Sequence, residues 1–170
     1  QSWVDGRIYG DAGLAKDMGP ADYRLSARVD GGSVYSFCMC PGGEIIPAVH
    51  DRGHYNTNGM SYFRKDTGFA NSGVVTTIEP EHFGATDVLA GIRFQQVSER
   101  RAAEVTGGGY SLPTQRLADF IAGRPSADVP PTSCRSGEHP ARVDELVQPW
   151  VTERVRQALR VFADQMSGYL

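Results

Sequence analysis

The sequence predicts an α+β fold, with an antiparallel β-meander in the first half of the chain and helices in the second half. Three observations support this prediction. Residues 23–29 alternate apolar and polar side chains, which is the period of a half-buried strand. The period changes at Pro80, and apolar residues then recur at helical spacing. From Val151 to Met166 they follow one face of a helix. We therefore expect a single domain, mainly β over residues 20–79 and mainly α over residues 80–170.

Five segments of the first half have the composition of strands, and turn residues separate them. The segments are residues 23–29, 33–39, 44–50, 57–63 and 73–78. Asp30-Gly31-Gly32 is a hairpin-type turn between the first two strands. Turn signals at such short spacing favour an antiparallel sheet over a parallel one.

The second half contains four segments with helical character. Residues 80–83 predict one helical turn with proline at its first position. Residues 92–105 and 113–121 carry apolar stripes, and Gly123 suits the C-cap of the second. The final helix is expected to begin at Pro149 and to end at Gly168. Residues 123–140 are rich in Pro, Ser and Gly, which predicts a long irregular loop.

Length, charge and cysteine content exclude several classes of protein. A chain of 170 residues can bury a core as one domain. Its net charge of −3 argues against a nucleic-acid partner, which a basic face would bind. No apolar run approaches the roughly 20 residues of a membrane span, so no membrane partner is expected. Three cysteines do not make a disulfide framework, and we expect a cytoplasmic location. Because the sequence begins with Gln1, a fragment or a processed piece is also expected.

The segment from Cys38 to Gly43 brings two thiols to the end of a predicted strand, followed by Pro41-Gly42-Gly43. Two residues apart on a strand, Cys38 and Cys40 should point to the same side, where a thiol pair can serve redox, metal or nucleophilic chemistry. The alternative is that both thiols are small buried apolar groups. Likewise, the glycines either let the backbone approach a ligand or form a tight turn. From these residues alone the two interpretations have about equal weight.

The histidines offer a weaker hypothesis. His50 and His54 with Cys38 and Cys40 would supply two imidazoles and two thiolates, a set suited to zinc. Gly53 lies between the histidines, however, and a helical spacing is not secured. We expect both histidines on a solvated loop, and no metal site is predicted.

Other glycine and asparagine motifs favour structural roles. Gly107-Gly108-Gly109 follows a predicted helix, whereas a dinucleotide fingerprint follows a strand and opens a helix. The chain therefore has no Rossmann fingerprint of its own. Asn58-Gly59 and Asn71-Ser72 lie beside predicted strands, where turn formation is favoured over hydrogen bonding to a ligand.

An ordered set of segments resembles one protein family. The most specific is residues 35–43, which contain Phe37-Cys38-Met39-Cys40-Pro41-Gly42-Gly43. The others are Ala21-Asp22-Tyr23, residues 57–62, Ala70-Asn71-Ser72, Phe83-Gly84, Leu89-Ala90-Gly91 and Gly108-Gly109-Tyr110. They cover most of residues 20–125. On these segments the chain resembles a family of largely uncharacterised bacterial FAD-dependent dehydrogenases, oxidoreductases related to the BaiN-like and aminoacetone-oxidase-like flavoproteins.

In that family an inserted domain splits a Rossmann-type FAD-binding domain, and this chain resembles the insert. The resemblance implies that the complete protein binds FAD, and that the FAD-binding remainder of the parent protein and a small-molecule substrate are the partners of this chain. The isolated chain should be inactive and should purify without colour. An insert separated from its parent should expose an apolar surface, which could cause self-association.

The resemblance also places the candidate site. Because the flavin carries the hydride chemistry, the protein positions the substrate and tunes the ring. We expect catalytic roles for Cys38 and Cys40. Cofactor contacts are expected from Pro41, Gly42, Gly43, Asn58 and Gly59, and substrate contacts from Met60, Ser61, Asn71 and Ser72. These residues would cap the flavin and shape the substrate site. The competing hypothesis is a non-enzymatic thiol- or zinc-binding module, or a structural interaction module.

Overall fold

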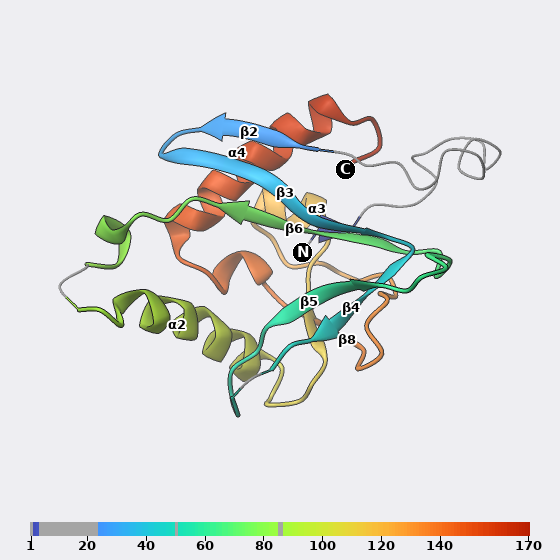
Figure 1. The fold of residues 1–170 in the computed structure, drawn as a ribbon, viewed down its shortest axis with the longest axis horizontal. Helices are drawn as coiled ribbons and strands as arrows, with labels where there is room; N and C mark the ends of the chain where they lie inside the picture. Colours follow the sequence, from blue (N-terminus) through green and yellow to red (C-terminus); the bar gives the residue numbers. More distant parts are fainter. Residues whose placement is uncertain (1, 4–23, 50, 85–86) are drawn as a thin grey trace.

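The computed structural model describes residues 2–3, 24–49, 51–84 and 87–170. Antiparallel strands occupy the first half of the chain and most of the helical residues lie in the second half, which confirms the α+β class (Figure 1). The start of the predicted strand at residues 23–29 and His50 fall outside the described residues. Within the described part of the chain, every helix is too short or too polar to cross a membrane.

The strands form two antiparallel units rather than one simple meander. A four-stranded sheet has the order β1-β6-β3-β2, from β1 (Ser2–Trp3), β6 (Ala70–Thr76), β3 (Gly32–Pro41) and β2 (Ser26–Val29). The hairpin of β4 (Gly43–Pro47) and β5 (Thr57–Ser61) forms the second unit. The prediction of a meander was wrong in this respect, because β6 returns to pair with β3 instead of with β5.

The helical half contains a further pairing that the sequence pattern did not predict. Its helices are η2 (Pro80–Phe83), α2 (Ala90–Val105), α3 (Leu117–Ala122), η3 (Val143–Glu145) and α4 (Pro149–Gln165). A helix was predicted over residues 113–121, but β7 (Leu112–Thr114) occupies its beginning. This strand pairs in parallel with β8 (Glu138–Pro140), which lies in the segment predicted as an irregular loop. Gly123 caps α3 with a left-handed φ of 66°, as predicted.

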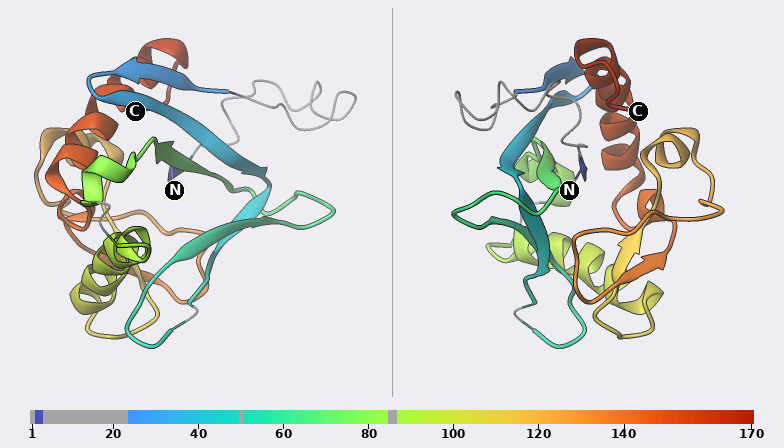
Figure 2. Two further views of the ribbon diagram at one scale, coloured as in Figure 1. Left: turned by 60° about the vertical axis from the view of Figure 1, so that its left-hand side comes forward. Right: turned by 90° about the vertical axis from the view of Figure 1, so that its right-hand side faces the viewer.

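The main core lies between α4 and one face of the four-stranded sheet (Figure 2). Leu25, Ala27 and Val34 point inward from β3 and from the segment that leads into and through β2. They meet Leu159 and Phe162 of α4, which are 2% and 0% exposed. The apolar stripe predicted for the last helix therefore faces the sheet, and its burial is the main apolar contribution to the fold.

Arg154 of α4 lies beneath the turn that joins β2 and β3. Its guanidinium donates to the carbonyl of Thr77 over 2.7 Å and stacks 4.8 Å from the centroid of the Trp150 ring. A Cβ on Gly31 would overlap this guanidinium, and Gly31 also has a φ of 82°. Gly31 and Gly32 thus allow both the tight turn and the close approach of Arg154 from α4.

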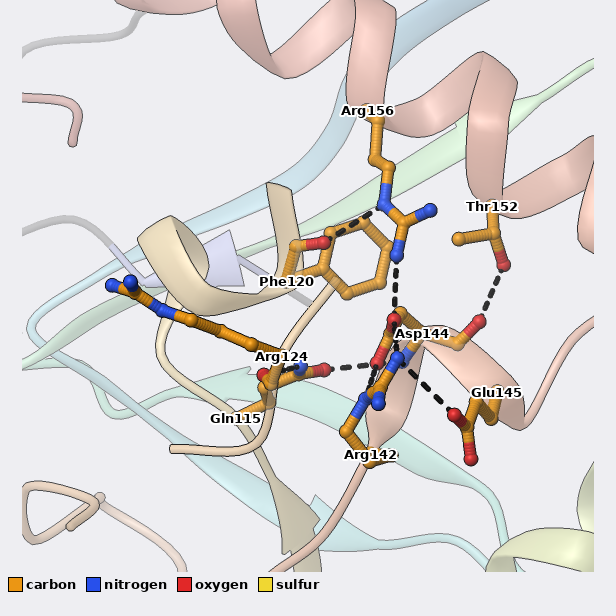
Figure 3. A network of polar contacts seen from close by, with 8 residues as sticks. All are labelled: Gln115, Phe120, Arg124, Arg142, Asp144, Glu145, Thr152 and Arg156. Carbon is orange, nitrogen blue, oxygen red and sulfur yellow. Dashed lines mark hydrogen bonds and ion pairs between the residues drawn. The ribbon is translucent and has the colours of Figure 1, made fainter. Parts of the chain in front are cut away.

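A buried carboxylate holds the helical half together (Figure 3). The side chain of Asp144 is 1% exposed and accepts two bonds of 2.7 Å from Arg142 and one of 2.5 Å from Arg156. Its backbone N–H donates to Gln115, and its carbonyl accepts from the Thr152 hydroxyl over 2.7 Å. The network therefore links η3 to α4 and to the segment before α3. The hydrogen bonds from Arg142 are the main cause that lowers the pKa of Asp144, and the charge of Arg156 acts in the same direction.

The turn between β3 and β4 is the tightest approach in the strand half. Gly42 has a φ of 56°, and a Cβ on it would overlap the backbone carbonyl of Lys65. The neighbouring N–H of Gly43 donates to the carbonyl of Phe69 over 3.1 Å. Packing against the Lys65 backbone therefore requires glycine at position 42.

Replacing Asp144 with asparagine should lower the free energy of unfolding by about 3 kcal/mol, the low end of the range for breaking a buried ion pair, because it removes the buried counter-charge of the half-buried Arg142 and Arg156. Urea unfolding followed by circular dichroism measures this. The matched control is Asp128→Asn, which breaks the exposed ion pair of Arg116 and should have a much smaller effect. Equal losses for the two variants would contradict a special role of the buried network.

The same network predicts how stability changes with pH. The folded-state pKa of Asp144 lies below its unfolded value, so its contribution is fully present above about pH 4 and is lost as the pH falls through the folded-state pKa. The wild type should therefore lose stability on acidification more steeply than Asp144→Asn. Unfolding curves of both proteins at a series of pH values between 7 and 2 test this. Parallel curves would contradict it.

Gly42→Ala should destabilise the chain by roughly 2 kcal/mol more than Gly68→Ala. Both glycines have a left-handed φ, 56° and 75°, but no atom lies within 4 Å of a Cβ placed on Gly68. The pair therefore separates the cost of backbone overlap from the cost of the left-handed conformation. Urea midpoints of the two variants measure the difference, and similar midpoints would show that the turn has room for a side chain.

Candidate functional site

The thiol segment at the end of β3 is not a regular strand. The pairing of β3 with β6 shifts register between Phe37 and Cys40, and Cys38 has a φ of 48°. The expectation that Cys38 and Cys40 point to one side assumed unbroken alternation, which this bulge interrupts. Cys38 is exposed, whereas Cys40 is half-buried and its thiol lies 3.4 Å from the Cys38 carbonyl. The two cysteines therefore have different surroundings.

Backbone strain is concentrated around this segment. A non-glycine residue seldom adopts a positive φ, and in the described residues only Cys38 and Lys65 do so. Lys65, with a φ of 50°, supplies the carbonyl that lies against Gly42. Both unusual conformations thus lie at one turn, and such outliers cluster at functional sites.

Three of the predicted site residues meet behind the turn. Cys40 of β3 is the Cα partner of Asn71 on β6. A Cβ on Gly59 of β5 would overlap the Asn71 side-chain oxygen and would lie 3.1 Å from the Cys40 sulfur. Asn71 is 1% exposed, and neither Oδ1 nor Nδ2 has a hydrogen-bond partner among the described residues. Buried amides are normally paired, so this unpaired amide requires an explanation.

The glycines of the site are packed by their own chain. The backbone carbonyl of Met60 would lie 2.5 Å from a Cβ on Gly43, and Gly59 lies against Asn71. The N–H of Gly59 donates to the side-chain oxygen of Asn58. Close packing within the chain therefore accounts for both glycines without a ligand.

The other predicted residues are distributed over the hairpin and β6. The Ser61 hydroxyl donates to the Pro41 carbonyl over 3.2 Å, which ties β5 to the turn. Met60 is half-buried, and Asn58 is exposed and alternates with Gly59 to the opposite face of β5. Ser72 is fully buried and faces away from its neighbour Asn71 by the same alternation. Asn58 and Ser72 thus lie outside the cluster that Cys40, Gly59 and Asn71 form.

The residues proposed for zinc show no metal geometry in the described part of the chain. No group of three His, Cys, Asp or Glu side chains suited to a metal ion occurs there, and His50 lies outside it. The His54 ring nitrogens lie 3.4 Å from Arg100 and 3.6 Å from Asp51.

The sequence pattern did not indicate a cavity of about 520 Å³ beside the hairpin, lined by Ile45, Thr57, Leu112 and Leu117 among others. Ile45 is the Cα partner of Gly59, so the cavity borders the same face of the hairpin as the Cys40–Gly59–Asn71 cluster. Tyr55 also lines the cavity, and burial is the main cause that raises the pKa of its hydroxyl. Tyr55 precedes β5 and belongs to no periodic apolar pattern, so the sequence did not indicate it as a cavity residue.

The comparisons with known proteins identify the family of the chain. The sequence model of the family described as "FAD-dependent protein, C-terminal domain-like" matches residues 1–170. A protein of Clostridium beijerinckii, described as an uncharacterized protein, is 35% identical over 175 residues. That match covers 99% of this chain and 32% of the relative, so the chain spans about a third of the relative's length. On both matches, the chain belongs to the family of FAD-dependent protein C-terminal-like domains.

Proposed function

We propose that this domain caps the flavin and shapes the substrate site of an FAD-dependent oxidoreductase, with the turn from Cys38 to Gly43 facing the reacting groups. The observation that carries the proposal is the exposed thiol of Cys38 on a left-handed backbone. A strained residue persists only where the surrounding structure enforces it, here through the β-bulge and the packed Gly42 turn. Family membership makes FAD the cofactor of the complete protein.

The residues of this chain are suited to contact the polar edge of the flavin ring. They are not suited to bind the whole FAD dinucleotide. The Asn71 amide offers one donor and one acceptor, both without partners among the described residues. The edge of a flavin ring, or a carbonyl-bearing substrate, can pair with both. Because Asn71 lies behind Gly59, the proposal requires the β5 segment at Gly59 to shift when the flavin-binding part is in place.

Each proposed role follows from position. When bound, the flavin supplies the hydride chemistry. The Cys38 thiol, which is exposed, would touch the substrate or the ring, while the half-buried Cys40 would set the position of the bulge. Pro41, Gly42, Gly43, Asn58 and Gly59 would border the cofactor, and Met60, Ser61 and Asn71 the substrate. Ser72 is fully buried on the opposite side of β6, so its position does not favour a substrate contact. The three free thiols suit a reducing compartment, and we propose a cytoplasmic location.

Alkylation of the thiols in the full natural reading frame that contains this chain tests the proposal. With FAD bound, iodoacetamide should modify Cys38 at least about tenfold more slowly than after FAD removal, because the flavin would cover the thiol. Mass spectrometry measures each cysteine separately. Cys134, which is 5% exposed, serves as the internal control and should react slowly in both states. Equal rates at Cys38 with and without FAD would refute the proposal.

A second readout uses the flavin itself. Cys38→Ser and Asn71→Leu should change the visible absorption spectrum or the reduction midpoint of the bound FAD, whereas Glu153→Gln on the exposed side of α4 should leave both unchanged. Variants that retain FAD with a wild-type spectrum and potential would place these residues away from the ring.

A further inference from the structure

The face of the four-stranded sheet opposite α4 exposes two aromatic side chains. Tyr35 and Phe37 are 42% and 55% exposed and lie two residues apart on β3, so they share this face. Their Cα partners on β6 are Val75 and Gly73. None of the described helices lies over this face (Figure 2). A sheet packed on one side normally presents polar residues on the other, and this one departs from that rule.

Two arginines lie beside the aromatic pair. Arg28 of β2 is exposed and alternates with the buried Ala27, and Arg24 precedes it at the same period. In the described residues neither arginine has an ion-pair partner. Aromatic residues and arginine are the types most enriched where protein surfaces bind one another. We call Arg24, Arg28, Tyr35 and Phe37 the outer face.

Two observations indicate what covers the outer face in the longer protein. The chain accounts for 32% of the length of its Clostridium relative, so in that relative about two thirds of the protein lies outside the matched part. Phe37 directly precedes Cys38, which makes the outer face continuous with the strained turn. We propose that the outer face docks against the remainder of the longer FAD-dependent protein.

The chemistry of that contact is set by the four side chains. Apolar side chains of the remainder would cover Tyr35 and Phe37, and carboxylates would lie opposite Arg24 and Arg28. The inference rests on family membership and the exposed residues, and it does not depend on the role of Cys38. A second copy of the chain is the competing occupant.

Hydroxyl-radical footprinting of the full natural reading frame tests the proposal. From exposure in this domain alone, Tyr35 and Phe37 would be oxidised at rates within a few-fold of Tyr110 and Phe63, which are 65% and 102% exposed. If the outer face is docked, Tyr35 and Phe37 should be oxidised at least about tenfold more slowly than this control pair. The protection should persist after FAD removal and on dilution, because the contact is within one polypeptide.

Matched substitutions give an independent measurement. The double variant Tyr35→Thr/Phe37→Thr keeps residues that favour strands but removes the aromatic rings. Its melting temperature in the full reading frame should fall by several degrees more than that of Phe63→Thr/Tyr110→Thr, which removes the same two residue types elsewhere. Arg24→Glu/Arg28→Glu should also lower the melting temperature, and high salt should reduce that effect.

The outcomes separate the possibilities. Oxidation of Tyr35 and Phe37 at the rate of the control pair would overturn the proposal. Protection that disappears on dilution would assign the face to a second copy and would also overturn it. A protected outer face together with equal Cys38 alkylation in the presence and absence of FAD would support this inference while refuting the flavin-facing role.

Discussion

The Asp144 carboxylate lies 1% exposed between the guanidinium groups of Arg142 and Arg156, and this buried charge ties the helical segments of the second half to one another. Through Thr152 and Arg156 it holds the first turns of α4, the helix whose Leu159 and Phe162 complete the core. Arg156 also donates to the carbonyl of Phe120, which brings α3 into the same arrangement. Burial of an ion pair adds little net energy compared with apolar packing, but it strongly penalises any arrangement in which one partner is missing. The network therefore determines the position of α4 more than it adds to the free energy of unfolding.

α4 covers one face of the sheet, and the candidate site lies where the sheet meets the hairpin. β3 leads through the bulge at Cys38 and the Gly42 turn directly into β4, so the chain passes from the four-stranded sheet to the hairpin at this point. The glycines let three backbone segments approach closely at this junction. The buried Asn71 amide, which has no hydrogen-bond partner among the described residues, lies there against Gly59 and Cys40, and the exposed Cys38 thiol lies in the bulge that precedes them. A buried amide without partners requires an explanation, and we propose that a group outside this chain pairs with it once β5 shifts at Gly59.

The sequence predicted the local elements well because their signals are local. Alternation placed Leu25 and Ala27 on the buried side of their strand, and the helical stripe through Leu159 and Phe162 was confirmed. It did not predict pairings between distant segments. β6 pairs with β3, and β7 with β8 across 23 intervening residues, because such choices depend on burial in three dimensions rather than on periodicity.

The candidate site was predicted in part. Family resemblance placed Cys40, Gly59 and Asn71 in one site, and the structure brings them together. The bulge at Cys38 interrupts the alternation from which its direction was predicted, since a bulge leaves no periodic trace. The cavity beside Tyr55 arises where β4, β7 and α3 converge, so no single segment could have indicated it.

The position of Arg154 has a consequence for how this domain can evolve. Its guanidinium occupies the space that a side chain on Gly31 would need, and it donates to the Thr77 carbonyl at the end of the neighbouring strand. A side chain at Gly31 would therefore strain the backbone at its φ of 82° and would also displace the Arg154 guanidinium, which would leave the Thr77 carbonyl without this donor. Homologous chains that keep Arg154 in this position should thus also keep Gly31, although the two lie 123 positions apart in the sequence, roughly the length of a small domain. What resembles an ordinary turn is a site whose variation is linked to that of a distant helix.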